Sequence, residues 1–285
     1  MTTATLSPSS TKVKFRLAGG AQPLIMVPVK VNGKGPFEFI LDTGAGTSLL
    51  SSELGQKLGV KILGSKEGQS AGGAVSVSLA RVNSLAVASA KLTNVDVGLV
   101  DLSHIGKTVG ANIDGDLGYN FLKHFRITLD YRKNEIRFED PKRFELAGRS
   151  TAVTEVVMRL ASLAKPLILI DVYANGRGPF QFAIDTGTST TAITPELAKQ
   201  LDVASSPIGA ATTGGAPVNV TAGILQSFQV GGARIEQLTV VVADFFAMLS
   251  NALGAKLDGI VGYNFLSNYK VALDYPNEKL ILFTP

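Results

Sequence analysis

The amino-acid sequence contains two copies of one unit, and this internal repeat restricts the fold more than any other feature. Asn-Gly-Lys-Gly-Pro-Phe at residues 32–37 returns as Asn-Gly-Arg-Gly-Pro-Phe at residues 175–180, which is 143 positions later. An Asp-Thr-Gly tripeptide follows each copy at the same spacing, at residues 42–44 and 185–187. Solenoid repeats are much shorter than this period, which has the length of a domain. The sequence therefore predicts a duplicated domain.

The repeat continues to the end of each unit. Residues 114–122, which close with Gly-Tyr-Asn-Phe-Leu, match residues 258–266 after the register has drifted by one position. Between the units, residues 141–151 are charged and contain glycine, as expected of a boundary. The predicted division is a Ser/Thr-rich flexible tail at residues 1–10, a first lobe at residues 11–145 and a second lobe at residues 146–285.

Composition excludes several classes of protein. With 285 residues, of which 45% are hydrophobic and 18% charged, the chain can bury a sizeable core. It has no cysteine, which excludes disulfides and thiolate metal sites. The two histidines, His104 and His124, have no counterpart in the second unit, so neither a zinc site nor a serine-hydrolase triad is indicated. We expect no metal and no cofactor.

Charge and hydropathy say little about partners. The net charge is +4, and adjacent basic residues occur only at residues 132–133 and 142–143, so a solvated surface is favoured over nucleic-acid binding. No apolar run approaches the length of a membrane span. The first ten residues have no apolar core and are not a signal peptide as they stand. Location stays open, since removal of a signal would suit a periplasmic or secreted protein.

The residue pattern predicts an all-β protein with few short helices. Apolar and polar residues alternate at residues 27–31, 75–79 and 218–220, and glycine-rich turns separate such segments. One helix start per unit follows the Asp-Thr-Gly loop. Thr194 before Pro195 and Glu196 combines an N-cap, a first-turn proline and an acid, and residues 51–53 (Ser-Ser-Glu) offer a similar start.

Each position of the doubled tripeptide has a chemical purpose. An apolar strand delivers Asp42 or Asp185 into a partly dry cleft, where two neighbouring carboxylates titrate jointly and share a proton. Hydrogen bonds from the hydroxyls of Thr43 and Thr186 can clamp the two loops together. The glycines, Gly44 and Gly187, permit close backbone approach and direct an N–H at the carboxylate. Such a pair can activate water for acid–base hydrolysis of an amide.

The motif resembles that of the aspartic peptidase family. Two apolar residues precede each Asp-Thr-Gly, and an apolar-apolar-Gly segment follows about seventy residues later. Residues 40–47 resemble the bacterial retropepsin-like form, and residues 183–189 are similar to the second loop of pepsins. The resemblance spans residues 11–283 and implies two six-stranded-barrel-like lobes related by a pseudo-twofold axis, with one or two short helices each. It further implies a monomeric aspartic endopeptidase that acts on peptide or protein substrates through Asp42 and Asp185.

The family also implies a flap, a hairpin that closes over bound peptide. Residues 68–77 and 212–220 fall at the matching places in the two units. Glycine-rich tips are mobile, which suits a gate, although a plain surface hairpin would look the same. The expected tip residues are Gly72 and Gly73 in the first unit and Gly214 and Gly215 in the second.

Two positions break the symmetry. Ala45 stands where the second loop has Thr188, so we expect Asp185 to be the better stabilised anion, because the Thr188 hydroxyl can donate to it. Asp116 stands where the second unit has Ile260, in a segment that the family keeps apolar. This carboxylate either faces solvent at the edge of the segment or marks a weaker core in the first lobe.

Three alternatives to an enzyme remain. The two aspartates could form ordinary Asx turns after strands. The same fold could serve as a catalytically silent peptide-binding module, since fold does not determine function. A scaffold whose halves pair with other chains would require the two Asp loops to lie far apart.

Overall fold

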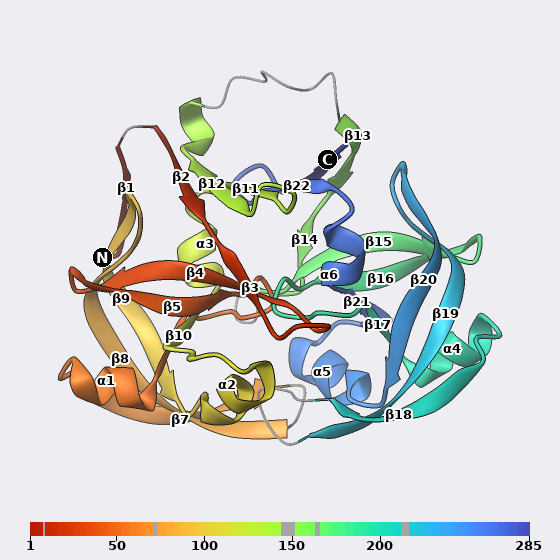
Figure 1. The fold of residues 1–285 in the computed structure, drawn as a ribbon, viewed down its shortest axis with the longest axis horizontal. Helices are drawn as coiled ribbons and strands as arrows, with labels where there is room; N and C mark the ends of the chain where they lie inside the picture. The colour runs from red at the N-terminus through yellow and green to blue at the C-terminus, as the bar shows by residue number, and fades with distance from the viewer. Residues whose placement is uncertain (8, 71–72, 144–151, 163–165, 212–216) are drawn as a thin grey trace.

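The structure is a computed structural model that describes residues 1–7, 9–70, 73–143, 152–162, 166–211 and 217–285. Most of these residues are in β-strands, arranged as two lobes side by side with a third sheet spanning them (Figure 1). The all-β fold with two similar lobes, expected from the internal repeat, is confirmed.

Six strands of the first lobe close into a barrel. The strands of this lobe are β3 (Arg16–Ala18), β4 (Leu24–Val31), β5 (Lys34–Leu41), β6 (Leu49–Ser51), β7 (Ile62–Ser70), β8 (Gly73–Val87), β9 (Ala90–Val100) and β10 (Gly115–Leu117). The ring runs β4–β5–β10–β6–β9–β8 and closes because β8 pairs with β4. Outside the ring, β7 forms a hairpin with β8, and β3 pairs with β4.

The second lobe repeats this barrel strand for strand. Its strands are β14 (Arg159–Leu160), β15 (Ile168–Ala174), β16 (Arg177–Ile184), β17 (Ala192–Ile193), β18 (Ser205–Ala211), β19 (Val218–Val230), β20 (Ala233–Ala243) and β21 (Gly259–Val261). The ring runs β15–β16–β21–β17–β20–β19 and back to β15. In both rings the strand that ends at the Asp-Thr-Gly loop pairs in parallel with the strand of the glycine segment.

A separate sheet joins the lobes. Its order is β13 (Ala152–Val157), β23 (Lys279–Phe283), β22 (Lys270–Asp274), β11 (Arg126–Asp130), β12 (Glu135–Glu139) and β2 (Ser10–Lys14). At its centre β11 and β22 are antiparallel, with Thr128 opposite Ala272. These two residues occupy the same place in the two repeats, so the pseudo-twofold axis passes between them.

Short helices complete each lobe. They are α1 (Ser52–Lys57), α2 (Ser103–Val109) and α3 (Tyr119–Leu122) in the first lobe, α4 (Pro195–Gln200), α5 (Phe246–Leu253) and α6 (Tyr263–Leu266) in the second, and a 3-10 turn at Pro141–Arg143. The two predicted starts are confirmed, because Ser51 caps α1 and Thr194 caps α4 with their side-chain oxygens. The other four α-helices of the described residues have no side-chain cap, which explains why no start was predicted for them.

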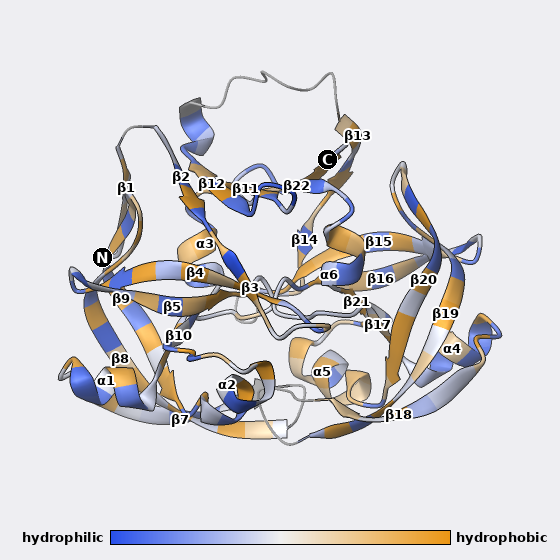
Figure 2. Cartoon of the chain, in the orientation of Figure 1, coloured by the Kyte–Doolittle hydropathy of each residue, from blue (hydrophilic) through white to orange (hydrophobic). Residues whose placement is uncertain are grey.

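Apolar and polar residues alternate along many of the barrel strands, which is visible as orange and blue segments (Figure 2). The barrel interiors contain large side chains such as Phe39 and Phe182. A smaller apolar cluster covers the other face of the same strands in each lobe. It includes Met26 and Ile40 in the first lobe, and Leu169 and Ile260 in the second.

The N-terminal residues differ from the expected flexible tail. Strand β1 (Thr3–Leu6) pairs antiparallel with β9, because the outer part of β9 offers free backbone groups to an extended segment. Residues 145 and 146, the expected lobe boundary, lie outside the described residues. No helix in the described ranges has the length and apolar character needed to cross a membrane.

Candidate active site

The two Asp-Thr-Gly loops meet at the pseudo-twofold axis. Asp42 follows β5 and Asp185 follows β16, so each aspartate stands at the end of a barrel strand. The backbone N–H of Asp42 donates to Leu117 O at 3.2 Å, and that of Asp185 donates to Val261 O at 3.2 Å. The glycine segments β10 and β21 therefore support the two loops in the same way.

Thr43 and Thr186 form a reciprocal clamp. Each hydroxyl donates to a backbone carbonyl of the other lobe, at 2.9 Å from Thr43 to Ile184 and at 2.7 Å from Thr186 to Leu41. Each hydroxyl oxygen also accepts the backbone N–H of the other threonine at 3.1 Å. Both side chains are 1% exposed, so these bonds are shielded from water. The clamp predicted from the sequence is present in this geometry.

The two glycines explain how close the loops come. A Cβ atom on Gly44 would lie 2.8 Å from Cγ of Asp185, and one on Gly187 would lie 2.8 Å from Cγ of Asp42. Each carboxyl group thus packs against the backbone of the opposite loop, where no larger residue fits. The carboxyls of Asp42 and Asp185 are hydrogen-bonded to each other. The wide separation that a scaffold of independent halves would need is not observed.

The remaining hydrogen bonds differ between the two aspartates. Oδ1 of Asp42 accepts the backbone N–H groups of Gly44 at 2.6 Å and Ala45 at 2.9 Å. Oδ1 of Asp185 accepts that of Gly187 at 2.8 Å, and its Oδ2 accepts the Thr188 hydroxyl at 2.7 Å. The hydroxyl contact expected for the second loop is therefore present, and Ala45 has no hydroxyl to match it.

Asp116 brings a third carboxyl to this pair. It lies on β10 and is only 7% exposed, so the expectation that it could face solvent at the edge of the segment is wrong. Its Cα pairs with Ile40, two residues before Asp42 on the same face of the strand, and its carboxyl is hydrogen-bonded to Asp42. Its Oδ1 is buried without a hydrogen-bond partner among the described residues.

Burial dominates the electrostatics of the three carboxyls. It raises the pKa of Asp42, Asp116 and Asp185 to about 8, because a carboxylate removed from water loses stability relative to the neutral acid. The charge of Asp116 further raises the pKa of Asp42, and the charge of Asp42 raises that of Asp185. The hydrogen bond from Thr188 opposes the rise in the pKa of Asp185, because it stabilises the anion.

A further set of hydrogen bonds supports the end of each Asp-Thr-Gly loop. Asn120 Oδ1 accepts the backbone N–H and the hydroxyl of Ser48, and Asn264 Oδ1 accepts the same two groups of Thr191, all at 2.8 Å. The hydroxyls of Ser48 and Thr191 in turn accept the N–H groups of the glycines that precede α3 and α6. Sequence reasoning did not assign these four residues, although the repeated Tyr-Asn-Phe-Leu contains both asparagines.

The expected flap tips lie mostly outside the described residues. This applies to Gly72, Gly214 and Gly215, whereas Gly73 begins β8 with a φ of 110°. The flanking strands do form hairpins, β7 with β8 and β18 with β19. Strand β7 also contacts α5 of the other lobe, so the first hairpin reaches across the molecule. A role as flaps stays a proposal.

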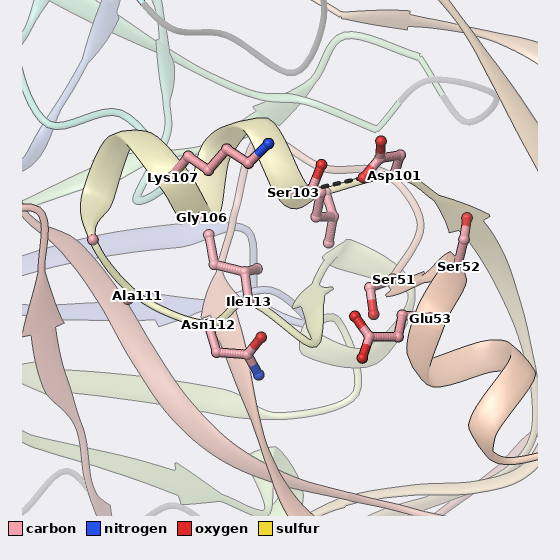
Figure 3. A pocket seen from close by; sticks show the side chains of 12 residues that line it. Ser51, Ser52, Glu53, Asp101, Ser103, Gly106, Lys107, Ala111, Asn112 and Ile113 are labelled. Atoms are coloured by element: carbon pink, nitrogen blue, oxygen red, sulfur yellow. Dashed lines mark hydrogen bonds between the residues drawn. The ribbon is translucent and has the colours of Figure 1, made fainter.

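A hollow in the first lobe lies away from the two aspartates. A pocket of about 410 Å³ between α1 and α2 is lined by residues that include Glu53, Asp101 and Lys107, and Ser103 N donates to Asp101 Oδ1 at 2.9 Å there (Figure 3). Neither Asp42 nor Asp185 lines it. Within the described ranges, no group of three or more His, Asp or Glu side chains is arranged to hold a metal ion.

Comparison with known families agrees with this geometry. A family model described as aspartyl protease matches residues 27–121 and matches again at residues 170–265. Each match contains one Asp-Thr-Gly loop and one glycine segment. The chain belongs to the aspartyl protease family. Both lobes are therefore units of this family within one chain. No curated protein matches the sequence.

Proposed function

We propose that the protein is an aspartic endopeptidase in which Asp42 and Asp185 activate a water molecule. The observation that supports this most directly is the contact of the two carboxyls across the pseudo-twofold axis, with each Asp packed on the opposite glycine. Two carboxyls in contact share protons, so one acts as a base while the other acts as an acid.

The asymmetry of the pair suggests which aspartate has which role. Asp185 receives the Thr188 hydroxyl, which stabilises its anion, and we assign it as the base that takes a proton from water. Asp42, beside Asp116, is assigned as the acid that donates to the carbonyl oxygen of the substrate. The water oxygen then bonds to the carbonyl carbon. The C–N bond breaks as the amine takes the proton held by Asp185, and a hydroxyl of the tetrahedral diol returns a proton to Asp42 as the new carboxyl group forms.

The surroundings of the pair favour a peptide with apolar side chains. The register places Met26 beside Ile40 in the first lobe and Leu169 beside Ala183 in the second, on the strand face that also carries the aspartates. Hydrophobic residues flanking the cleaved bond would bury apolar surface against the partly exposed side chains that pack on these clusters. Because one chain supplies both aspartates, we propose that the active form is a monomer.

Cleavage of a mixed peptide library between pH 4 and pH 9 tests the proposal. We expect cleavage that a pepstatin-type inhibitor blocks and that Asp42→Asn abolishes, because the amide cannot serve as the acid. Asp96→Asn is the control, since the side chain of this aspartate is exposed and forms an ion pair with Arg81 at the surface. If peptides bind but are not cleaved at any pH in this range, the proposed peptidase activity is contradicted. That result would support the alternative, a catalytically silent peptide-binding module.

A further inference from the structure

We propose that Asp116 is a positioning residue of the active site, which holds Asp42 in its protonated form through a hydrogen bond between the two carboxyl groups. This inference rests on the proposed peptidase function and adds a third carboxyl to its chemistry. It assigns a role to a position at which the two lobes differ in polarity, Asp116 against Ile260.

The strand register explains why Asp116 reaches Asp42. Strand β10 is parallel to β5, with Asp116 opposite Ile40 and Leu117 opposite Leu41. Side chains alternate between the faces of a strand, so residues 40 and 42 share a face and Asp116 joins them there. Leu117 instead points into the barrel core. The carboxyl is therefore directed at the catalytic pair by the same register that places an apolar side chain, Ile260, in the second lobe.

Asp116 also provides a side-chain contact to Asp42, which Ala45 in the first loop does not provide. In the second loop the side chain of Thr188 contacts Oδ2 of Asp185, while the first loop has only backbone N–H groups for Asp42. Asp116 supplies the missing side-chain partner from a neighbouring strand. The two partners act in opposite directions, because a hydroxyl donor stabilises the anion of Asp185, whereas a carboxylate acceptor stabilises the protonated form of Asp42.

The pKa of Asp116 depends on burial and on the two neighbouring aspartates. The groups that shift the pKa of Asp116 are Asp42 through its hydrogen bond and Asp185 through its charge, besides burial itself. Tyr275 lies within reach of the charge of Asp42, but burial raises the pKa of its phenol and keeps it neutral. On the strands beside β10, the residues paired with Asp116 are the uncharged Ile40 and Leu49.

The protons shared by the three carboxyls determine the pH at which Asp42 is deprotonated. The hydrogen bonds that join Asp42 to Asp116 and to Asp185 each require a proton between the two carboxyls, and a third carboxylate nearby makes each proton harder to remove. Asp42 therefore remains an acid at higher pH than it would with an apolar neighbour. Asp116 exchanges no proton with substrate and is unchanged after a turnover.

Two substitutions in the full-length chain test this role. Asp116→Ile copies Ile260, which the same strand geometry accommodates in the second lobe, and Asp116→Asn keeps the shape but offers an amide donor to the Asp42 anion. We expect the alkaline limb of kcat/KM to move to lower pH in the Ile variant and further in the Asn variant. From an alkaline pKa of about 8, a shift of about one pH unit lowers the ratio of kcat/KM at pH 8 to that at pH 5 by about fivefold. Asp96→Asn should leave this ratio unchanged.

Carboxyl carbon NMR of Asp42 gives a second readout that needs no activity. We expect Asp42 to titrate at lower pH in both Asp116 variants than in the wild type. An unchanged Asp42 titration overturns the proposal whether or not the protein cleaves peptides. If the wild type cleaves nothing, only the proposed function fails, and the titration still decides the role of Asp116. A variant that alters only KM, with the pH profile unchanged, would show that Asp116 contacts substrate and would overturn the positioning role.

Discussion

At the scale of single residues, the two aspartates are chemically identical, and their neighbours make them differ. The side chain of Thr188 contacts Asp185, and the side chain of Asp116 contacts Asp42, while Ala45 contributes only a backbone N–H. A hydroxyl donor beside Asp185 favours its anion, and a carboxylate acceptor beside Asp42 favours its neutral acid. In the proposed mechanism this difference assigns the base and the acid.

Thr188→Ala should move the acid limb of the pH–rate profile to higher pH. Loss of the 2.7 Å hydrogen bond destabilises the Asp185 anion and raises the pKa of that carboxyl. A hydrogen bond to a charged group contributes about 1.5–3 kcal/mol, which corresponds to a shift of about one unit or more. Thr188→Ser retains the hydroxyl and is the matched control. Superimposable profiles of the Ala and Ser variants would contradict the role of this contact.

At the scale of secondary-structure elements, the site is built from strand ends and the loops that follow them. The loop after β5 and the loop after β16 are joined by the four hydrogen bonds of Thr43 and Thr186. Strands β10 and β21 hold the same loops from the side through the N–H groups of the two aspartates. The position of each carboxyl therefore depends on elements from both lobes.

Thr43→Val should lower the free energy of unfolding by about 2–4 kcal/mol. The substitution keeps the volume but leaves two buried backbone groups, Ile184 O and Thr186 N, without their partner, and each such group costs about 1–3 kcal/mol. Urea denaturation of the wild type, Thr43→Val and Thr43→Ser measures the effect. The Ser variant keeps the hydroxyl and should lose much less stability. Equal losses in the two variants would show that the clamp contributes little.

At the scale of the whole molecule, two closed barrels share one sheet and one cluster of carboxyls. Besides the β11–β22 pairing, ring contacts cross between the lobes, from Tyr119 to Tyr275 at 5.6 Å and from Tyr131 to Tyr263 at 5.4 Å. Each tyrosine of a short helix packs edge-on against a tyrosine of the other lobe. This interface keeps the lobes in the arrangement that brings the carboxyls into contact.

The stability of the whole chain should depend on pH through this cluster. Because the pKa of Asp42, Asp116 and Asp185 is raised from 3.8 to about 8, the folded state binds protons that the unfolded state has lost between these pH values. The cluster's contribution to stability is therefore lost as pH rises from about 4 to about 8. The slope is about 1.4 kcal/mol per pH unit for each proton held.

Urea denaturation at pH 5 and pH 8 measures this dependence. The triple variant Asp42→Asn, Asp116→Asn, Asp185→Asn lacks the three titrating groups, so its stability should change less with pH than that of the wild type. Parallel changes in the two proteins would show that other groups dominate.

Several features of the fold follow from the sequence because they are local or repeated. Duplication at a fixed spacing predicts two similar lobes, since equal sequences fold alike. Ser51 and Thr194 predict helix starts, because a cap requires only a side chain and the next turn of backbone. The uncapped helices α3 and α6 carry no such signal, and the pairing of β1 with β9 depends on a free strand edge that is distant in sequence.

Some features of the candidate site likewise follow from the sequence, whereas others depend on contacts between distant residues. Alignment of the two repeats is enough to place Asp42 and Asp185 in equivalent loops and to show that Thr188 faces Ala45 at the matching position. The burial of Asp116 against Asp42 is seen only in the folded chain. That contact arises from the parallel register of β10 on β5, which joins residues more than seventy positions apart and is set by closure of the barrel. A local sequence pattern does not encode such a register, so the contact of Asp116 with Asp42 could not be predicted from the sequence.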